Sequence, residues 1–195
     1  VTGRAMLAGS SPLRNMRGGQ AFSSALTLLD RPRMELAAGS APFDAEGVPT
    51  RDKTLVDQGV FRGFVYDLAT ASLAGTESTG NAGRDYDTPP APVVTNLEMK
   101  PGNLSMDELL GRADGGCLVC SFQGGNSDAA TGDFTLDAGA AFTVSDGKPA
   151  ARIRRLTVSG NSYRLLSRVG GLSKSRRLCG RDLLPYLSAE AVDCG

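Results

Sequence analysis

Histidine and tryptophan are both absent from the 195-residue chain. Without histidine, the chain can supply no Ser-His-Asp triad, no imidazole general base and no histidine ligand for zinc. Aromatic residues make up only 6% of the sequence, so the core must rest on Leu, Val, Ala and a few Phe. No apolar run approaches the roughly 18 residues of a membrane-spanning helix, and no signal peptide opens the chain. We therefore expect a cytoplasmic protein with no membrane partner.

The overall composition is that of a folded protein, with 41% hydrophobic and 22% charged residues, and its 25 glycines favour many turns. The net charge is zero but unevenly placed. Residues 148–195 hold 10 Lys and Arg against 3 Asp and Glu, whereas residues 1–147 hold 11 against 18. A basic end can bind nucleic acid, or it can form a solvated face paired with the acidic part. Only Tyr163 and Tyr186 accompany these cations as stacking residues, so nucleic acid is not the expected partner.

Alternating apolar and β-branched runs predict short strands. They cover residues 21–29, 53–57, 60–66, 93–99, 117–122, 134–136, 140–144, 151–158 and 183–187. Gln58-Gly59 and Asp146-Gly147 suit tight hairpin turns. A break in the alternation at Arg155 predicts a bulge.

Capping residues predict three short helices. Asp67 is a good N-cap for residues 68–73, and Ser105 forms a capping box with Glu108. The third helix is expected over residues 161–169.

Two polar segments, residues 76–92 and 124–132, read as loops. Together these elements predict an α+β fold: a mainly antiparallel or mixed β-sheet domain with a few short helices, which spans residues 1–195.

The four cysteines, Cys117, Cys120, Cys179 and Cys194, are expected to be cytosolic thiols. Cys117 and Cys120 have the spacing of a zinc knuckle, but no second such pair exists. Leu118 and Val119 between them favour a strand, on which residues three apart face opposite sides. We therefore expect Cys117 and Cys120 to be buried structural thiols.

Two loop motifs have a chemical and a structural interpretation. Asp44 and Glu46, one residue apart, could work as an acid–base pair. In a glycine-flanked loop, capping of a turn through backbone N–H groups is the more common role for such carboxylates. The segment Gly80–Gly83 could cradle an anion, but it does not connect a clear strand to a helix as a phosphate-binding loop does.

A series of loop motifs in a fixed order closely resembles the C-terminal domain of the TldD/PmbA family. This family comprises metalloprotease subunits that are also named modulators of DNA gyrase. The motifs, none of them specific alone, are Phe43-Asp44-Ala45-Glu46-Gly47, Gln58-Gly59-Val60, Ser78-Thr79-Gly80-Asn81-Ala82-Gly83-Arg84, Thr95-Asn96-Leu97, Pro101-Gly102, Thr131-Gly132-Asp133-Phe134, Val158-Ser159-Gly160-Asn161, and Cys179-Gly180 followed by Leu184-Pro185.

The resemblance implies one of two branches. TldD-like members carry an HExxxH zinc helix upstream of the segment that resembles residues 9–20, and TldE/PmbA-like members lack it and pair with a TldD-like subunit. The TldE-like details are Asp30-Arg31-Pro32, Ser78 before Thr79-Gly80, Thr131-Gly132-Asp133 and the absence of histidine. On this interpretation the chain is the C-terminal domain alone, without the family's N-terminal domain, and it supplies no catalytic residue and no cofactor. Zinc belongs to the TldD-like partner.

The resemblance also implies site residues. Thr79, Gly80, Asn81, Arg84 and Asn96 are candidates for the peptide cleft, where an extended peptide would add to a sheet edge. Cys179 matches a zinc-ligand position of TldD-like members, but non-catalytic relatives also carry this Cys. A packed thiol is therefore the expectation for Cys179 here.

Three functions stay open at this point. The expected one is a non-catalytic TldE/PmbA-like subunit of a zinc metalloprotease that acts on unfolded peptides, as a heterodimer with a TldD-like subunit or as a homodimer. The second is a TldD-like peptidase whose HExxxH helix lies upstream of residue 1. The third is a module that binds nucleic acid or modulates DNA gyrase through the basic end.

Overall fold

The structure is a computed structural model that describes residues 1–35, 37–129, 131–190 and 192–195. The chain divides into two compact units, and neither is continuous in sequence. The first consists of Val1–Lys100 and Arg177–Leu184, and the second of Pro101–Arg176 and Pro185–Gly195. The two units thus alternate along the chain: residues 101–176 of the second unit lie between the two pieces of the first, and residues 185–195 follow them.

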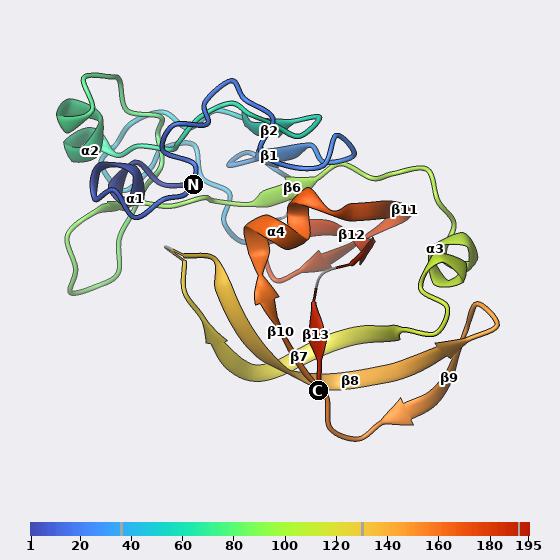
Figure 1. The fold of residues 1–195 in the computed structure, drawn as a ribbon. Coiled ribbons are helices and arrows are strands. Elements are labelled where there is room, and N and C mark those ends of the chain that lie inside the picture. The colour runs from blue at the N-terminus through green and yellow to red at the C-terminus, as the bar shows by residue number, and fades with distance from the viewer. Residues whose placement is uncertain (36, 130, 191) are drawn as a thin grey trace. The chain divides into compact units, whose positions relative to one another are not determined.

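The first unit is built on a small sheet of short strands (Figure 1). Its strands, in the order in which they neighbour one another, are the first three residues of β12 (Asp182–Ala189), then β6 (Leu97–Met99), β1 (Leu28–Asp30), β2 (Lys53–Asp57) and β3 (Val60–Phe61). The contact of β12 with β6 is parallel and places Leu183 opposite Glu98, while the other pairs are antiparallel. A separate two-stranded ladder joins β4 (Ala82–Gly83) to β5 (Ala91–Pro92).

The predicted Gln58-Gly59 turn is confirmed, with φ of 48° and 81° at its two central residues. The predicted strand over residues 21–29 is wrong for most of its length, because β1 begins only at Leu28. The N–H groups of Ala21 and Phe22 both donate to the Gly59 carbonyl, and the Ser23 hydroxyl accepts the Ala25 N–H. The N–H groups of residues 21, 22 and 25 are therefore bonded to the β2–β3 turn and to a serine hydroxyl, and they do not pair with a neighbouring strand.

Among the residues that the structure describes there are four short helices: α1 (Gly3–Leu7), α2 (Leu68–Leu73), α3 (Met106–Arg112) and α4 (Ser162–Ser167). Both predicted capping residues are confirmed. Asp67 caps α2 through the Thr70 N–H, and Ser105 and Glu108 form the reciprocal capping box of α3. No helix in the described part of the chain is both long and apolar enough to cross a membrane.

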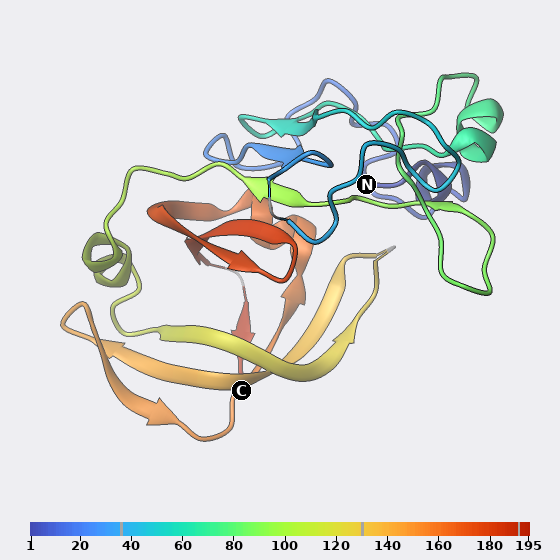
Figure 2. The ribbon, with the colours of Figure 1, turned by 180° about the vertical axis from the view of Figure 1, so that it is seen from behind.

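The second unit is dominated by long antiparallel strands. The longest are β7 (Cys117–Ser127) and β8 (Asp133–Ser145). The unit also contains β9 (Lys148–Ile153), β10 (Thr157–Asn161), the two-residue β13 (Asp193–Cys194), most of β11 (Val169–Cys179) and residues 185–189 of β12. The sheet order is β13-β10-β8-β7, and β9 also pairs with β8. Both ribbon views show β7 and β8 running side by side and bending along their length (Figure 2). Ala141 of β8 forms a small buried apolar cluster with Leu156 and Val158, against which Val119 and Phe134 pack.

Two sequence predictions for this unit need correction, and one strand was missed. Residues 124–127, expected in a loop, continue β7, whose side chains are exposed from Cys120 to Ser127. An exposed strand has no buried face, so its sequence carries no apolar alternation. The change of phase at Arg155 marks the break between β9 and β10 instead of a bulge, and β11 was not predicted. The α+β class with mainly antiparallel sheets is confirmed.

Candidate functional site

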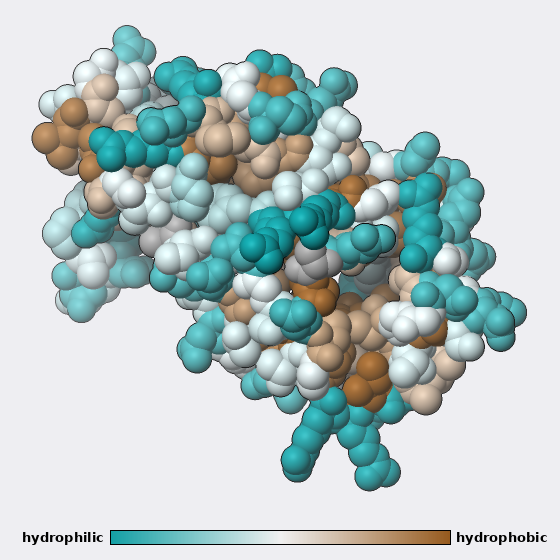
Figure 3. Space-filling view, in the orientation of Figure 1, coloured by the Kyte–Doolittle hydropathy of each residue, from teal (hydrophilic) through white to brown (hydrophobic). Residues whose placement is uncertain are grey.

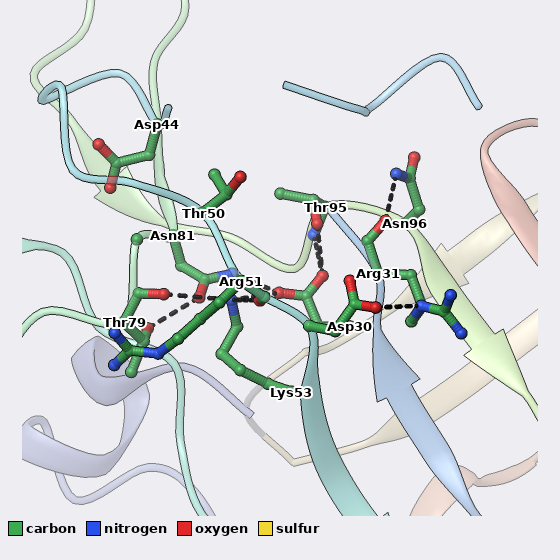
Figure 4. Close-up of polar contacts among 12 residues, drawn as sticks. Asp30, Arg31, Asp44, Thr50, Arg51, Lys53, Thr79, Asn81, Thr95 and Asn96 are labelled. Carbon is green, nitrogen blue, oxygen red and sulfur yellow. Dashed lines mark hydrogen bonds and ion pairs between the residues drawn. The ribbon is translucent and has the colours of Figure 1, made fainter. Parts of the chain in front are cut away.

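A buried carboxylate, Asp30, is the centre of a polar cluster in the first unit (Figure 4). Asp30 ends β1 and is completely shielded from solvent. Its Oδ1 accepts the Thr95 N–H at 2.8 Å and the Thr95 hydroxyl at 2.5 Å. Its Oδ2 accepts an N–H of the Asn81 amide at 2.7 Å. One side chain therefore ties the end of β1 to two segments that follow it by 51 and 65 residues.

Lys53 of β2 neutralises this carboxylate. Its Nζ lies 3.3 Å from Asp30 Oδ2 and donates to the carbonyls of Arg51 at 2.7 Å and Thr79 at 3.1 Å. Burial lowers the pKa of Lys53, and the negative charge of Asp30 acts in the opposite direction. The Lys53 ammonium group is thus held by one ion pair and two carbonyl groups, although its burial disfavours the charged form.

The loop that carries Thr79, Gly80 and Asn81 is fixed by the same cluster. Asn81 is fully buried; its amide also donates to the Val93 carbonyl at 2.8 Å, and its Oδ1 accepts the Thr79 hydroxyl at 2.8 Å. Gly80 has φ of 69°, and a Cβ on it would lie 2.6 Å from the Pro49 carbonyl oxygen. Only glycine fits this position without a shift of the backbone.

Asn96 is the second fully buried amide and has a separate set of partners. Its Oδ1 accepts the Gly39 N–H at 2.9 Å. Its Nδ2 donates to the Arg31 carbonyl at 2.7 Å and to the Ser40 hydroxyl at 3.0 Å. The Asn96 side chain therefore bonds to backbone groups of Arg31 and Gly39.

Asp44 and Glu46 have the capping role that the sequence favoured. Asp44 Oδ1 accepts the N–H groups of Glu46 and Val48, and its Oδ2 accepts the Ala82 N–H, all at 2.9 Å. Glu46 Oε2 accepts the N–H of Leu68, the first residue of α2, at 2.8 Å. Both carboxylates are thus bound to backbone donors.

The structure brings Thr79, Gly80 and Asn81 together around Asp30, places Asn96 at the next loop, and leaves Arg84 exposed. Contact of these residues with a peptide stays a prediction. Sequence reasoning missed Asp30 and Lys53 as the centre of the cluster. The signal in the sequence was that Asp30 directly follows the apolar pair Leu28-Leu29. A carboxylate at the end of a buried strand needs a partner for its charge, so the sequence could have predicted a buried polar contact here.

The cysteines differ from their predicted environments. Cys117 is half-buried, but Cys120 is exposed, so the pair is not buried as expected. Cys179 ends β11 and is also exposed, so the prediction of a packed thiol is wrong; it directly precedes Gly180, whose φ is 64°. Within the described residues no three His, Cys, Asp or Glu side chains are grouped as metal ligands. The side chains described here do not make a zinc site by themselves.

Comparison with known proteins places this geometry in a family. The profile of the PmbA/TldA metallopeptidase C-terminal domain matches residues 1–195. A metalloprotease of Methanothermobacter thermautotrophicus is 32% identical over 180 residues, which cover 90% of this chain and 39% of that protein. A TldD homologue of Buchnera aphidicola from Schizaphis graminum is 29% identical over 181 residues, which cover 89% of this chain and 38% of that protein.

Two solved structures share the fold. TldE from Thermococcus kodakarensis superposes with a TM-score of 0.88 at 31% identity and covers 99% of this chain, which corresponds to 45% of TldE. A Thermotoga maritima protein described as a modulator of a DNA gyrase gives 0.88 at 29% identity, with 100% of this chain and 45% of that one covered. The chain thus spans about two fifths of the length of these curated relatives and slightly more of these solved structures.

Proposed function

From one premise, that the chain belongs to the PmbA/TldA metallopeptidase family as its C-terminal domain, we propose that it is the non-catalytic, TldE/PmbA-like part of a zinc metallopeptidase. It supplies walls and an interface for a peptide cleft, and a TldD-like subunit supplies the zinc. The substrate is an unfolded peptide, and the assembly works in the cytoplasm, an environment that suits four unpaired cysteines.

The observation that carries the proposal is the use of the carboxylates in the first unit. Asp44 and Glu46 each accept backbone N–H groups, and Asp30 is buried against Lys53. A general base needs a free lone pair within reach of a substrate proton. Asp30 and Asp44 accept hydrogen bonds on both oxygens, and Glu46 accepts one at the start of α2. All three carboxylates therefore hold the backbone or a neighbouring loop, and the chain has no histidine to take the role of the base.

One observation favours a second candidate, a TldD-like peptidase with its HExxxH helix upstream of residue 1. Cys179 is exposed and follows a long strand into a tight turn, so its thiol is accessible to a metal held by other ligands. The similar proteins include some named TldD and one named TldE, so both branches of the family occur among them.

The test uses the full-length protein that contains this chain, alone and mixed with a TldD-like subunit from the same organism. Hydrolysis of a fluorogenic unstructured peptide is measured with and without a chelator. We expect no cleavage by the protein alone and chelator-sensitive cleavage by the mixture. Cleavage by the protein alone, with an HExxxH motif in its upstream sequence, would establish the second candidate instead.

Cys179→Ser separates the two candidates further, with Cys120→Ser as the matched exposed cysteine. In the proposed function, neither substitution changes the zinc content of the isolated protein. In the second candidate, only Cys179→Ser lowers it, as measured by elemental analysis after dialysis.

A further inference from the structure

Two cysteines from opposite ends of the second unit's sheet lie against each other. Cys117 is the first residue of β7 and pairs across the ladder with Thr143. Cys194 lies in β13 and pairs with Val158. The Sγ atoms are 3.7 Å apart although the residues are separated by 77 positions in sequence. The curl of the sheet therefore brings its first and last strands into contact at these two thiols.

The surroundings of the two thiols differ. Cys117 is half-buried and packs on the apolar cluster of Ala141, Leu156 and Val158, whereas Cys194 is exposed. Cys120 is exposed on the same strand as Cys117. A disulfide needs the two sulfurs to approach to about 2.05 Å. β13 has only two residues, so a small shift of this strand, together with rotation of the side chains, can supply the approach.

We propose that Cys117 and Cys194 are a reversible dithiol–disulfide pair, oxidised by a low-molecular-weight disulfide such as oxidised glutathione. The bond joins β7 to β13 and closes the path β13-β10-β8-β7 into a covalent ring. This inference is independent of the proposed peptidase role, because it depends only on contacts within the second unit.

The reaction runs by two thiol–disulfide exchanges. The exposed Cys194 thiolate attacks one sulfur of oxidised glutathione, forms a mixed disulfide and releases one glutathione thiolate. The Cys117 thiolate then attacks Cys194 Sγ and releases the second. Two protein thiols lose two electrons and two protons, and one oxidised glutathione becomes two reduced molecules.

The order of attack follows from the environment of Cys117. Burial, and then the neighbouring Cys194 thiol, raise the pKa of Cys117 to about 11. Cys117 is therefore the poorer first nucleophile. Once Cys194 carries glutathione, it can no longer become a thiolate that repels a second negative charge, and the Cys117 thiol becomes easier to ionise.

The closed ring has a measurable consequence. A crosslink between positions so far apart in sequence restricts the unfolded chain strongly, which stabilises the folded state relative to it. For a chain of this size, we expect the melting temperature of the oxidised protein to exceed that of the reduced protein by roughly 5 to 15 °C.

The experiment compares the wild-type protein equilibrated with oxidised glutathione and with a reducing agent. Unreduced peptide mapping by mass spectrometry identifies the linked cysteines, and calorimetry gives the melting temperatures. We expect the Cys117 peptide to be linked to the Cys194 peptide and the oxidised form to melt higher. Because both forms have the same sequence, the comparison does not depend on whether a variant folds.

Two variants complete the design. Cys194→Ser should lose both the linked peptide and the temperature difference, whereas the matched variant Cys120→Ser should keep both. Several results would overturn the proposal: four free thiols after oxidation, glutathione left on Cys194, a bond that involves Cys120 or Cys179, or a Cys117–Cys194 bond with no rise in melting temperature.

Discussion

Buried polar side chains are distributed very unequally between the two units. Of the nine buried polar or charged residues in the described part of the chain, eight lie in the first unit, and the ninth, Ser173, lies in the second. The first unit has strands of two to five residues apart from its share of the β11–β12 hairpin, whereas β7 and β8 have 11 and 13 residues. Long ladders pair their own backbone groups. Loops need side chains such as those of Asp30 and Asn96 to do so.

The hydrophobic surface shows a related contrast within the first unit. Figure 3 shows apolar surface over α2, where the side chains of Leu68 and Leu73 are 50% and 76% exposed. The fully buried positions of the same unit include Asp30, Asn81 and Asn96. This unit therefore relies on satisfied hydrogen bonds to fix its loops, and its stability should be sensitive to loss of a single polar group.

Removal of the Asp30 carboxylate is the strongest test of this contrast. Asp30→Ala leaves the half-buried Lys53 without its counter-ion and leaves the Thr95 N–H and one N–H of the Asn81 amide without an acceptor. We expect a loss of about 3 to 5 kcal/mol in the free energy of unfolding, measured with urea. Asp57→Ala, which removes an exposed ion pair with Arg62, is the control and should cost less than about 1 kcal/mol. Equal effects would contradict the assigned role of the network.

Truncation of the apolar cluster tests the second unit. Leu156→Ala should lower the free energy of unfolding by about 2 to 4 kcal/mol, because Leu156 packs with Ala141 and Val158. Hydrogen exchange should show the loss of protection in β7 to β10. Phe122→Ala, at a side chain that is 50% exposed, should cost less than about 1 kcal/mol. A larger cost for Phe122→Ala would show that the other face of the sheet is the buried one.

Two glycines separate backbone strain from steric fit. Gly75 and Gly80 have nearly the same φ, 65° and 69°, but a Cβ meets nothing within 4 Å at Gly75 and lies 2.6 Å from the Pro49 carbonyl at Gly80. Gly75→Ala should cost about 1 kcal/mol for the left-handed conformation alone. Gly80→Ala should cost about 3 kcal/mol by urea unfolding. Similar costs would mean that the loop at Gly80 can move away from Pro49.

The smallest expected effect is the pH dependence of the α3 capping box. The bond from the Ser105 N–H holds the pKa of Glu108 below its ordinary value of 4.5. The charged carboxylate therefore stabilises the fold above pH 4.5, and this contribution is lost as the pH falls through the lower folded-state pKa. Unfolding of wild type and Glu108→Gln as a function of pH should show an advantage at neutral pH that disappears in acid. A pH-independent difference would argue against the ionised cap.

Local signals in the sequence were sufficient for the helix starts and tight turns. Asp67, Ser105 and Gln58-Gly59 act on neighbours within a few residues, so their roles can be recognised without the fold. The role of Asp30 could not be recognised in this way, because its partners Asn81 and Thr95 lie 51 and 65 residues away. The exposed half of β7 was missed for a different reason, since a strand without a buried face has no periodic pattern.

The family-derived cleft residues show a similar division. The sequence singled out the segment that carries Thr79, Gly80 and Asn81, and the structure places all three in one connected cluster. The sequence did not show that Asn81 and Asn96 are buried and that their side-chain amides are hydrogen-bonded. Burial depends on which distant loops cover a residue, and the identity of the residue does not fix that.

The parallel pairing of Leu183 with Glu98, and the bond from the Leu97 N–H to Asp182 at 2.8 Å, have a consequence for biosynthesis. A ribosome makes β6 long before β12, and the whole of residues 101–176 is synthesised between them. The edge of β6 that pairs with β12 is therefore without this partner until residues 182–189 have been synthesised. The ladder of β7 and β8, which are consecutive in sequence, can form earlier. A translational pause before residue 177 would consequently leave the second unit's long hairpin paired and the first unit's sheet one strand short.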